Sequence, residues 1–141
     1  MTSQHKGILL VEDDQNDVFF MKYALSKANL EDPVHVSSDG QDAIDYLAGS
    51  APYADRAFHP LPRCVFLDLK LPSVHGFEVL KWIRNEPALS HIPVFILTSS
   101  SESRDRQKAQ ELGANAYLLK PPSSKMLQDV MVQHGCAPSP R

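Results

Sequence analysis

The sequence predicts an α/β fold: a doubly wound, five-stranded parallel sheet with helices on both of its faces. Five short runs consist almost entirely of apolar residues, which is typical of strands buried on both faces of a parallel sheet. Longer segments with a helical spacing of apolar residues separate these runs, and this alternation indicates five successive strand-helix units. The runs are "ILLV" (8–11), "VHV" (34–36), "CVFL" (64–67), "VFIL" (94–97) and "AYLL" (116–119).

The segments between the runs carry apolar residues three and four positions apart, which places them on one face of a helix. In the first segment Val18, Met21 and Leu25 follow this spacing. The fourth segment is mostly polar and has Ala109 and Leu112 as its main apolar anchors, so we expect a weakly held helix there. The predicted helices cover 15–29, 41–48, 77–84, 102–112 and the stretch from Ser123 to just before Gly135.

Composition and charge limit the classes of function. The chain has 141 residues, of which 43% are hydrophobic and 22% charged, and this suits one globular domain with a substantial core. A net charge of -3 argues against direct binding of nucleic acid. The start, "MTSQHKG", does not lead into a signal peptide, and no apolar run is long enough to span a membrane. We therefore expect a soluble, cytoplasmic protein.

Two segments fall outside the strand-helix pattern. The connection at 49–62 contains 14 residues with three prolines, which is longer than such a connection requires, and it is either an ordinary insertion or a partner-facing loop. We expect a single domain over the 141 residues, with its core at about 6–134 and a tail at 135–141 in which "CAPSPR" is frayed. Cys64 is predicted to be a small core residue and Cys136 lies in the tail, so the cysteines suggest neither a disulfide framework nor a metal site.

Polar residues follow the first, third, fourth and fifth predicted strands. In a parallel sheet the carboxyl ends of the strands share one edge, and doubly wound folds bind their ligands at that edge. Each residue alone has a structural explanation, as when Asp14 simply caps the first helix. Their convergence on one edge is what predicts a site. The residues are Glu12, Asp13 and Asp14 after the first strand, Asp68 after the third, Thr98 at the end of the fourth, and Lys120 after the fifth.

The chemistry of these side chains is coherent. Carboxylates that lie close together repel one another, and a divalent cation relieves the repulsion. Oxygen ligands of this kind suit Mg²⁺, which takes one or two carboxylates and a phosphate oxygen and keeps several waters. A metal, an ionised aspartate, a lysine and a hydroxyl are the groups needed for phosphoryl transfer onto a carboxylate. The pattern predicts that Asp68 is the nucleophile, that Mg²⁺ and Lys120 neutralise the phosphoryl oxygens, and that Thr98 donates a hydrogen bond to one of them.

Four motifs together resemble the signature of the receiver domains of two-component response regulators. "LLVEDD", "FLDLKLP", "ILTSS" and "YLLKPP" stand in the order of that family, and the resemblance covers roughly residues 6 to 134. It implies the flavodoxin-like (βα)5 receiver fold with strand order 2-1-3-4-5. It also implies a phospho-accepting signalling switch that is not an enzyme, beyond autocatalytic phosphotransfer and autodephosphorylation.

The resemblance implies a set of metal ligands. Asp13 and Asp68 would hold Mg²⁺ together with the backbone carbonyl of Lys70, while Glu12 acts mainly through water. Glu12 stands where the family more commonly has an aspartate. The side chain of Lys70 borders the path of the water that attacks the acyl phosphate, and its effect on the lifetime of the phosphoryl group is left open.

The resemblance also implies the phosphoryl-binding and switch residues. Asp68 would be the phosphoacceptor, and Thr98 and Lys120 would bind the phosphoryl group. Tyr117 falls at the position of the family's switch aromatic, and the signal would leave through the face built from the fourth helix, fifth strand and fifth helix. The peptide bond from Lys120 to Pro121 is expected to be cis.

The spacing of the motifs suggests partners. The distance from Asp13 to Asp68 exceeds the usual one by about ten residues, comparable with the long loop. In this respect the chain is similar to stand-alone regulators that answer bacterial phytochromes and related histidine kinases. The implied partners are such a sensor histidine kinase or a phosphotransfer protein. The residues after Lys120 leave no room for an output domain, so we expect output through another protein or a homodimer, with no nucleic acid or membrane involved.

Two other functions fit parts of the pattern. A phosphohydrolase of the haloacid dehalogenase type also uses an aspartate nucleophile, Mg²⁺, a hydroxyl and a lysine, but it requires a second aspartate where Lys70 stands. A degenerate receiver would act only as a protein-binding module. The presence of every acceptor-site residue argues against that second alternative.

Overall fold

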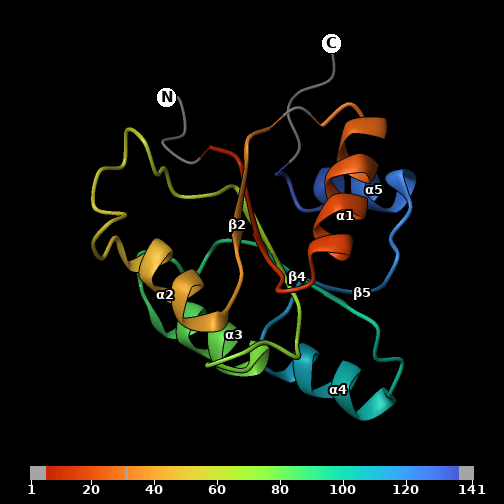
Figure 1. Cartoon of the computed structure of the whole chain (residues 1–141). Helices are drawn as coiled ribbons and strands as arrows, with labels where there is room; N and C mark the ends of the chain where they lie inside the picture. The colour runs from red at the N-terminus through yellow and green to blue at the C-terminus, as the bar shows by residue number, and fades with distance from the viewer. Residues whose placement is uncertain (1–5, 31, 137–141) are drawn as a thin grey trace.

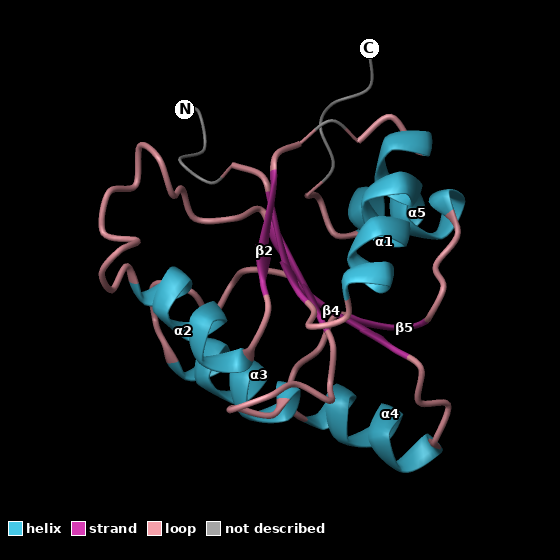
Figure 2. Cartoon of the chain, in the orientation of Figure 1, coloured by secondary structure: helices cyan, strands magenta, loops and turns pink. Residues whose placement is uncertain are grey.

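The computed structural model describes residues 6–30 and 32–136, and within them five strands alternate with five helices (Figures 1 and 2). The strands form one parallel sheet in the order β2-β1-β3-β4-β5. Both the doubly wound fold class and the strand order predicted from the sequence are therefore confirmed. The strands are β1 (Ile8–Val11), β2 (Val34–Ser37), β3 (Cys64–Leu67), β4 (Val94–Thr98) and β5 (Ala116–Leu119).

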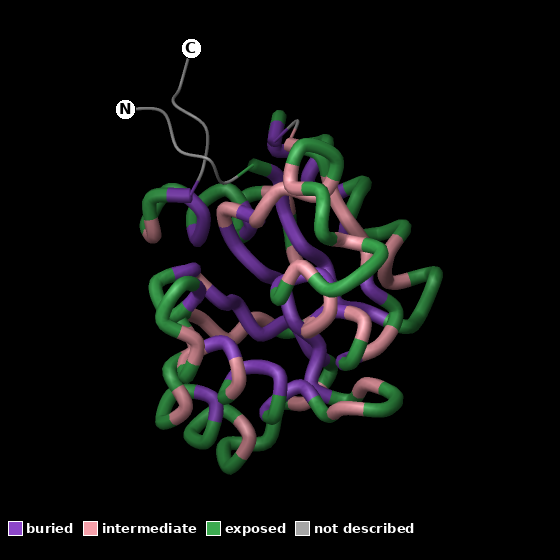
Figure 3. Tube along the Cα trace, turned by 90° about the vertical axis from the view of Figure 1, so that its left-hand side faces the viewer, coloured by how far each residue is buried: buried purple, intermediate pink, exposed green. Residues whose placement is uncertain are grey.

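Every residue of β1, β3 and β4 is buried, which explains why their sequences are continuously apolar. The edge strands differ, because most residues of β2 and β5 are only half-buried. Figure 3 shows the buried segments at the centre of the molecule and the exposed turns around them. The three central strands therefore form a rigid platform, and the residues that follow them are held in fixed positions.

Helices cover both faces of the sheet. Helices α1 and α5 pack on one face, while α2, α3 and α4 pack on the other (Figure 1). Phe66 and Phe95 point toward α1 and α5, whereas Val65 and Ile96 point toward the opposite layer, as the alternation along a strand requires. The helices are α1 (Gln15–Lys27), α2 (Gly40–Ala48), α3 (Gly76–Asn85), α4 (Ser103–Glu111) and α5 (Ser124–Gln133).

The ends of the helices follow local backbone geometry. Helix α1 ends two residues before the predicted position 29, because Asn29 adopts a left-handed conformation with φ 59°. Helix α5 begins after Ser123, whose hydroxyl accepts the Met126 N–H at 3.1 Å, and Gly135 with φ 71° follows its end as predicted. Helix α4 buries only Ala109 among its nine residues, which confirms the expected scarcity of apolar anchors.

The loop at 49–62 is fixed to the body of the protein. The guanidinium of Arg56 donates hydrogen bonds of 2.8 Å to the carbonyls of Tyr46 and Leu47, at the end of α2. Tyr46 in turn donates its hydroxyl hydrogen to the carbonyl of Pro60 at 2.8 Å. These contacts define the position of the loop, and whether it also faces a partner stays a prediction.

The C-terminal segment corrects one expectation. Cys136 was expected to lie in a frayed tail, but it is 4% exposed and packs in the same apolar cluster as Cys64, which is buried as predicted. A hydrogen bond links their two thiols. The segment folds back because Gly135 turns the chain toward the core. The rest of the expected tail, 137–141, lies outside the described residues. None of the helices in the described ranges has the length and apolarity needed to cross a bilayer.

Candidate functional site

The candidate site lies at the carboxyl edge of the sheet, where backbone pairing continues one residue beyond the strands. The N–H of Glu12 donates to the carbonyl of Ser37 at 2.9 Å, which extends β1 along β2. The N–H of Asp68 donates to the carbonyl of Val11 at 3.1 Å, so Asp68 lies beside the end of β1. On the other side, the N–H of Lys120 donates to the carbonyl of Thr98 at 2.9 Å. These bonds bring residues far apart in sequence to one edge.

The turn after Asp68 is compressed against the start of α3. The N–H of Gly76 donates to the carbonyl of Leu69 at 2.8 Å. A Cβ atom on Gly76 would lie 2.3 Å from the carbonyl oxygen of Asp68, so no other residue fits without moving that backbone. Gly76 therefore positions the aspartate loop. Its role was not identified from the sequence, because a close approach of this kind leaves only a glycine as its signal.

Three carboxylates converge at the site. Oxygen atoms of Glu12, Asp13 and Asp68 all lie within 4.8 Å of one another. Glu12 is 3% exposed and Asp68 is 7% exposed, whereas Asp13 is exposed to solvent. Three hard oxygen donors with one open side match the coordination that Mg²⁺ or another divalent cation accepts in proteins. The acidic cluster could therefore bind a divalent ion.

The ammonium group of Lys120 lies among carboxylates. Its Nζ is 2.5 Å from Oε1 of Glu12 and 3.0 Å from Oδ2 of Asp68. It also donates a hydrogen bond of 2.9 Å to Oδ2 of Asp17, in the first turn of α1. The sequence analysis missed Asp17. The available signal was its position four residues after Asp13, which places the two carboxylates on the same side of a helix.

Burial and charge shift the pKa values of both groups. Burial raises the pKa of Glu12 from 4.5 to about 7, although its hydrogen bond with Lys120 acts in the opposite direction. Burial alone would lower the pKa of Lys120, but its hydrogen bonds to Glu12 and Asp17 and the charge of Asp68 outweigh this effect and raise it. The lysine is therefore a permanent cation at the site, and Glu12 exchanges its proton near neutral pH.

Asp14 serves the first helix, as the sequence suggested. Its Oδ1 accepts the N–H groups of Asn16 at 2.8 Å and Asp17 at 3.2 Å, which caps the start of α1. The N–H of Asp14 itself donates to Oε2 of Glu12 at 3.1 Å. The cap therefore fixes the first turn of α1 relative to the acidic cluster.

Thr98 and Tyr117 are joined through Ser100. Thr98 is 1% exposed, and its hydroxyl oxygen accepts the Ser100 N–H at 3.3 Å. The hydroxyl of Tyr117 donates to the carbonyl of Ser100 at 2.8 Å, and the guanidinium of Arg106 lies over its ring at 4.7 Å. The Ser100 hydroxyl donates to Oδ2 of Asp105 in α4 at 2.7 Å. Ser100 was not singled out from the sequence, where it is one of three consecutive serines.

Lys70 and the peptide bond after Lys120 complete the predicted set. The side chain of Lys70 is exposed beyond the buried Asp68 and Leu69. The bond from Lys120 to Pro121 is cis, as expected, and a second cis bond joins Ala51 to Pro52. The structure thus brings Glu12, Asp13, Asp68 and Lys120 together, whereas Thr98 contacts Ser100 and Tyr117 is held two residues away from it along the chain of hydrogen bonds.

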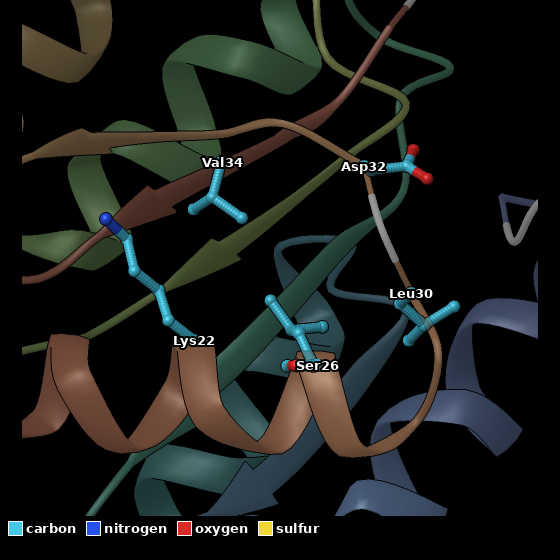
Figure 4. Close-up of a pocket in the computed structure, with 6 residues that line it drawn as sticks. Lys22, Ser26, Leu30, Asp32 and Val34 are labelled. Atoms are coloured by element: carbon cyan, nitrogen blue, oxygen red, sulfur yellow. The ribbon is translucent and has the colours of Figure 1, made fainter.

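A separate pocket of about 290 Å³ lies between α1 and β2 (Figure 4). It is placed toward the beginning of β2, at the opposite edge of the sheet from the acidic cluster. It is lined by Lys22, Leu25, Ser26, Leu30, Asp32 and Val34. The wall combines aliphatic side chains with one cation and one anion, and none of these residues belongs to the candidate site.

A (βα)5 domain that gathers acidic residues, a threonine and a lysine at its carboxyl edge has the architecture of the receivers of two-component signalling. The description "response regulator receiver domain" matches residues 8–131 of this chain. The match covers most of the sequence, and the chain belongs to this family, whose members are typically signalling modules without enzymatic activity of their own. Membership favours a receiver over the phosphohydrolase considered above.

Known relatives support the assignment. Response regulator Rcp1 of Synechocystis sp. is 36% identical over 130 residues, which cover 91% of this chain and 84% of Rcp1. The bacteriophytochrome response regulator RtBRR has a TM-score of 0.85 at 40% identity, covering 97% of this chain and 82% of that one. The Mn²⁺-bound form of Rcp1 has a TM-score of 0.79 at 32% identity, with 96% and 99% covered. The phosphorylated cyanobacterial phytochrome response regulator RcpA has a TM-score of 0.76 at 34% identity, with 93% and 90% covered.

Proposed function

We propose that this chain is a phosphorylation-dependent switch that accepts a phosphoryl group on Asp68. The observation that carries the proposal is the position of Asp68, whose Oδ2 contacts the Lys120 ammonium at 3.0 Å inside a cluster of three carboxylates. A nucleophile, a cation for the incoming phosphoryl oxygens and a set of metal ligands thus share one small site. The phosphorylated structure of RcpA, a relative, supports the same chemistry here.

Mg²⁺ is the proposed cofactor. Asp13, Asp68 and the backbone carbonyl of Lys70 would hold the ion, with Glu12 acting mainly through water. The three carboxylates are hard oxygen donors, and the exposure of Asp13 provides a route of entry. The Mn²⁺-bound structure of Rcp1 supports a divalent ion at the equivalent region. When bound, the ion supplies charge that offsets the developing negative charge on the phosphoryl oxygens.

In the transfer step, a carboxylate oxygen of Asp68 attacks the phosphorus atom of the donor. The new O–P bond forms as the bond to the donor's leaving group breaks, and that group departs with the electron pair. Lys120 pairs with one phosphoryl oxygen and Thr98 donates its hydroxyl hydrogen to another. Hydrolysis of the acyl phosphate by water regenerates Asp68, and the exposed Lys70 borders the path of that water.

The signal is proposed to leave through Ser100. If Thr98 turns toward the phosphoryl group, its oxygen no longer accepts the Ser100 N–H, and the segment that also holds Tyr117 and Asp105 is released. Tyr117 can then turn inward. The altered surface would be the one built from α4, β5 and α5, and α4 is suited to movement because it buries only Ala109.

The proposed partners follow from the same relatives. RtBRR is a bacteriophytochrome response regulator, which supports a sensor histidine kinase of the phytochrome type, or a phosphotransfer protein, as the donor here. We place the whole chain in a single receiver domain with its core at about residues 6–134. Output would then pass to another protein or to a second copy of the chain through the α4-β5-α5 face, and a symmetric dimer would use this face twice.

The test is phosphorylation with a small-molecule phosphodonor and Mg²⁺, followed by intact-mass measurement. The wild-type protein should gain one phosphoryl group, and Asp68→Asn should gain none, because an amide cannot form the acyl phosphate. Asp129→Asn is the matched control, since it makes the same chemical change at an exposed carboxylate of α5. A stable adduct on a serine or a histidine, or equal labelling of Asp68→Asn, would refute the assignment.

A further inference from the structure

Asp17 is the one carboxylate around Lys120 that lies outside the acidic cluster. It sits in the first turn of α1, and its side chain is 37% exposed, compared with 2% for Glu12 and 9% for Asp68. Its Oδ2 accepts a hydrogen bond of 2.9 Å from the ammonium, across a separation of 103 residues in the sequence. The contact therefore ties the start of α1 to the end of β5.

The ammonium of Lys120 has no donor left over. It carries three N–H groups, and three carboxylates lie within 3.0 Å of its nitrogen atom. A phosphoryl oxygen can be bound only if at least one of these contacts is given up. Two of the three partners have other roles in the proposed chemistry, because Asp68 becomes the acyl phosphate and Glu12 belongs to the acidic cluster. Asp17 has no such role, so its contact can persist throughout.

We propose that Asp17 is a positioning residue for the phosphorylation site, which anchors the Lys120 ammonium on the α1 side while its contacts with Glu12 and Asp68 are exchanged for a phosphoryl oxygen. This inference rests on the function proposed above. Without the anchor, the ammonium settles more deeply between Glu12 and Asp68, where its charge competes with a divalent cation. Loss of Asp17 therefore weakens metal binding and also slows phosphoryl transfer.

The experiment compares the wild-type protein with Asp17→Asn, Asp17→Glu and Asp129→Asn. Asp17→Asn removes the charge and keeps the size of the side chain, whereas Asp17→Glu keeps the charge. Asp129→Asn makes the same change at a solvent-exposed ion pair on α5, where the Asp129 side chain is 60% exposed. The dissociation constant of Mg²⁺ is measured by calorimetry, and the rate of phosphorylation by a small-molecule donor is measured at saturating Mg²⁺. Circular dichroism checks that each variant is folded.

We expect Asp17→Asn to bind Mg²⁺ about fivefold more weakly and to be phosphorylated about fivefold more slowly even at saturating Mg²⁺. Asp17→Glu should restore most of both losses, and Asp129→Asn should match the wild type. Full recovery of the Asp17→Asn rate at saturating Mg²⁺ would overturn the positioning role, because it would reduce Asp17 to a remote charge. Values equal to those of the wild type would overturn it as well.

A direct measurement separates this inference from the proposed function. The ammonium signal of Lys120 in ¹⁵N NMR spectra reports the protection of its N–H groups and needs neither metal nor phosphodonor. We expect faster hydrogen exchange of this signal in Asp17→Asn than in the wild type or in Asp129→Asn. If the wild-type protein takes up no phosphoryl group, the proposed function fails on its own; if the NMR signal is unchanged by Asp17→Asn, the anchor fails.

Discussion

Replacement of Glu12 by glutamine tests the electrostatics of the acidic cluster. Burial raises the pKa of Glu12 from 4.5 to about 7 in the folded protein without metal. In the unfolded chain the group keeps its ordinary pKa, so between pH 4.5 and 7 the folded state binds the proton more tightly. Stability is therefore lost as the pH rises through this window, and the difference between the two pKa values corresponds to about 3 kcal/mol of unfolding free energy.

Glutamine cannot ionise, so the Glu12→Gln protein lacks this loss. Burial lowers the pKa of His35, which gives a pH dependence of opposite sign, but His35 is present in both proteins and its effect cancels when they are compared at each pH. We expect the unfolding free energy of Glu12→Gln, relative to the wild type, to rise by about 3 kcal/mol between pH 4.5 and 8. Urea unfolding in buffer with a chelator measures it, with the partly buried Trp82 as the fluorescent reporter.

The control for this measurement is Glu102→Gln. Glu102 is exposed at the start of α4 and makes no side-chain cap hydrogen bond there, so its replacement should leave the pH dependence unchanged. Added Mg²⁺ should reduce the difference between Glu12→Gln and the wild type, because a nearby cation favours the ionised carboxylate. Parallel stability curves for the wild type and Glu12→Gln from pH 4.5 to 8 would refute the assigned pKa.

Three further outcomes are expected. Lys70→Ala should change the rate of autodephosphorylation if the ammonium reaches the phosphoryl group, with the exposed Lys81→Ala as control; equal decay rates would favour a solvated lysine. Arg56→Met should lower the unfolding free energy by about 2 kcal/mol and raise amide exchange within 49–62, because three hydrogen bonds to carbonyl groups are lost; unchanged exchange would contradict the clamp. A phosphoryl mimic should alter amide exchange across 98–132; changes confined to 49–62 would rule out the proposed switch.

The sheet and most of the site could be predicted because both depend on one strong signal. Continuous apolar runs mark strands that are buried on both faces, and the first polar residue after each run must lie at the carboxyl edge. This reasoning located Asp68 and Lys120 without any knowledge of the packing between elements. It also placed Glu12 and Asp13 beside them, and the structure brings the oxygens of all three acids within 4.8 Å.

The residues that were missed depend on contacts between elements. Asp17 lies on a helix, and its contact with Lys120 requires the rotation of α1 relative to the sheet, which the spacing of apolar residues defines only roughly. Gly76 matters because α3 approaches the carbonyl of Asp68 closely, and an approach of two backbone segments leaves no pattern of its own. Cys136 follows the glycine that ends α5, and the return of the chain to the core beside Cys64 is decided by tertiary packing.

Ser100 explains how a small chemical change could alter a large surface. Its backbone N–H, carbonyl and hydroxyl each make one hydrogen bond, and these lead to Thr98, Tyr117 and α4 respectively. A hydrogen bond contributes about 1 kcal/mol net, and an allosteric shift needs about 1 to 3 kcal/mol. Breaking one or two of these bonds is therefore enough, provided that little else holds the moving element. Helix α4 meets that condition, because Ala109 is the only residue it buries within Ser103–Glu111.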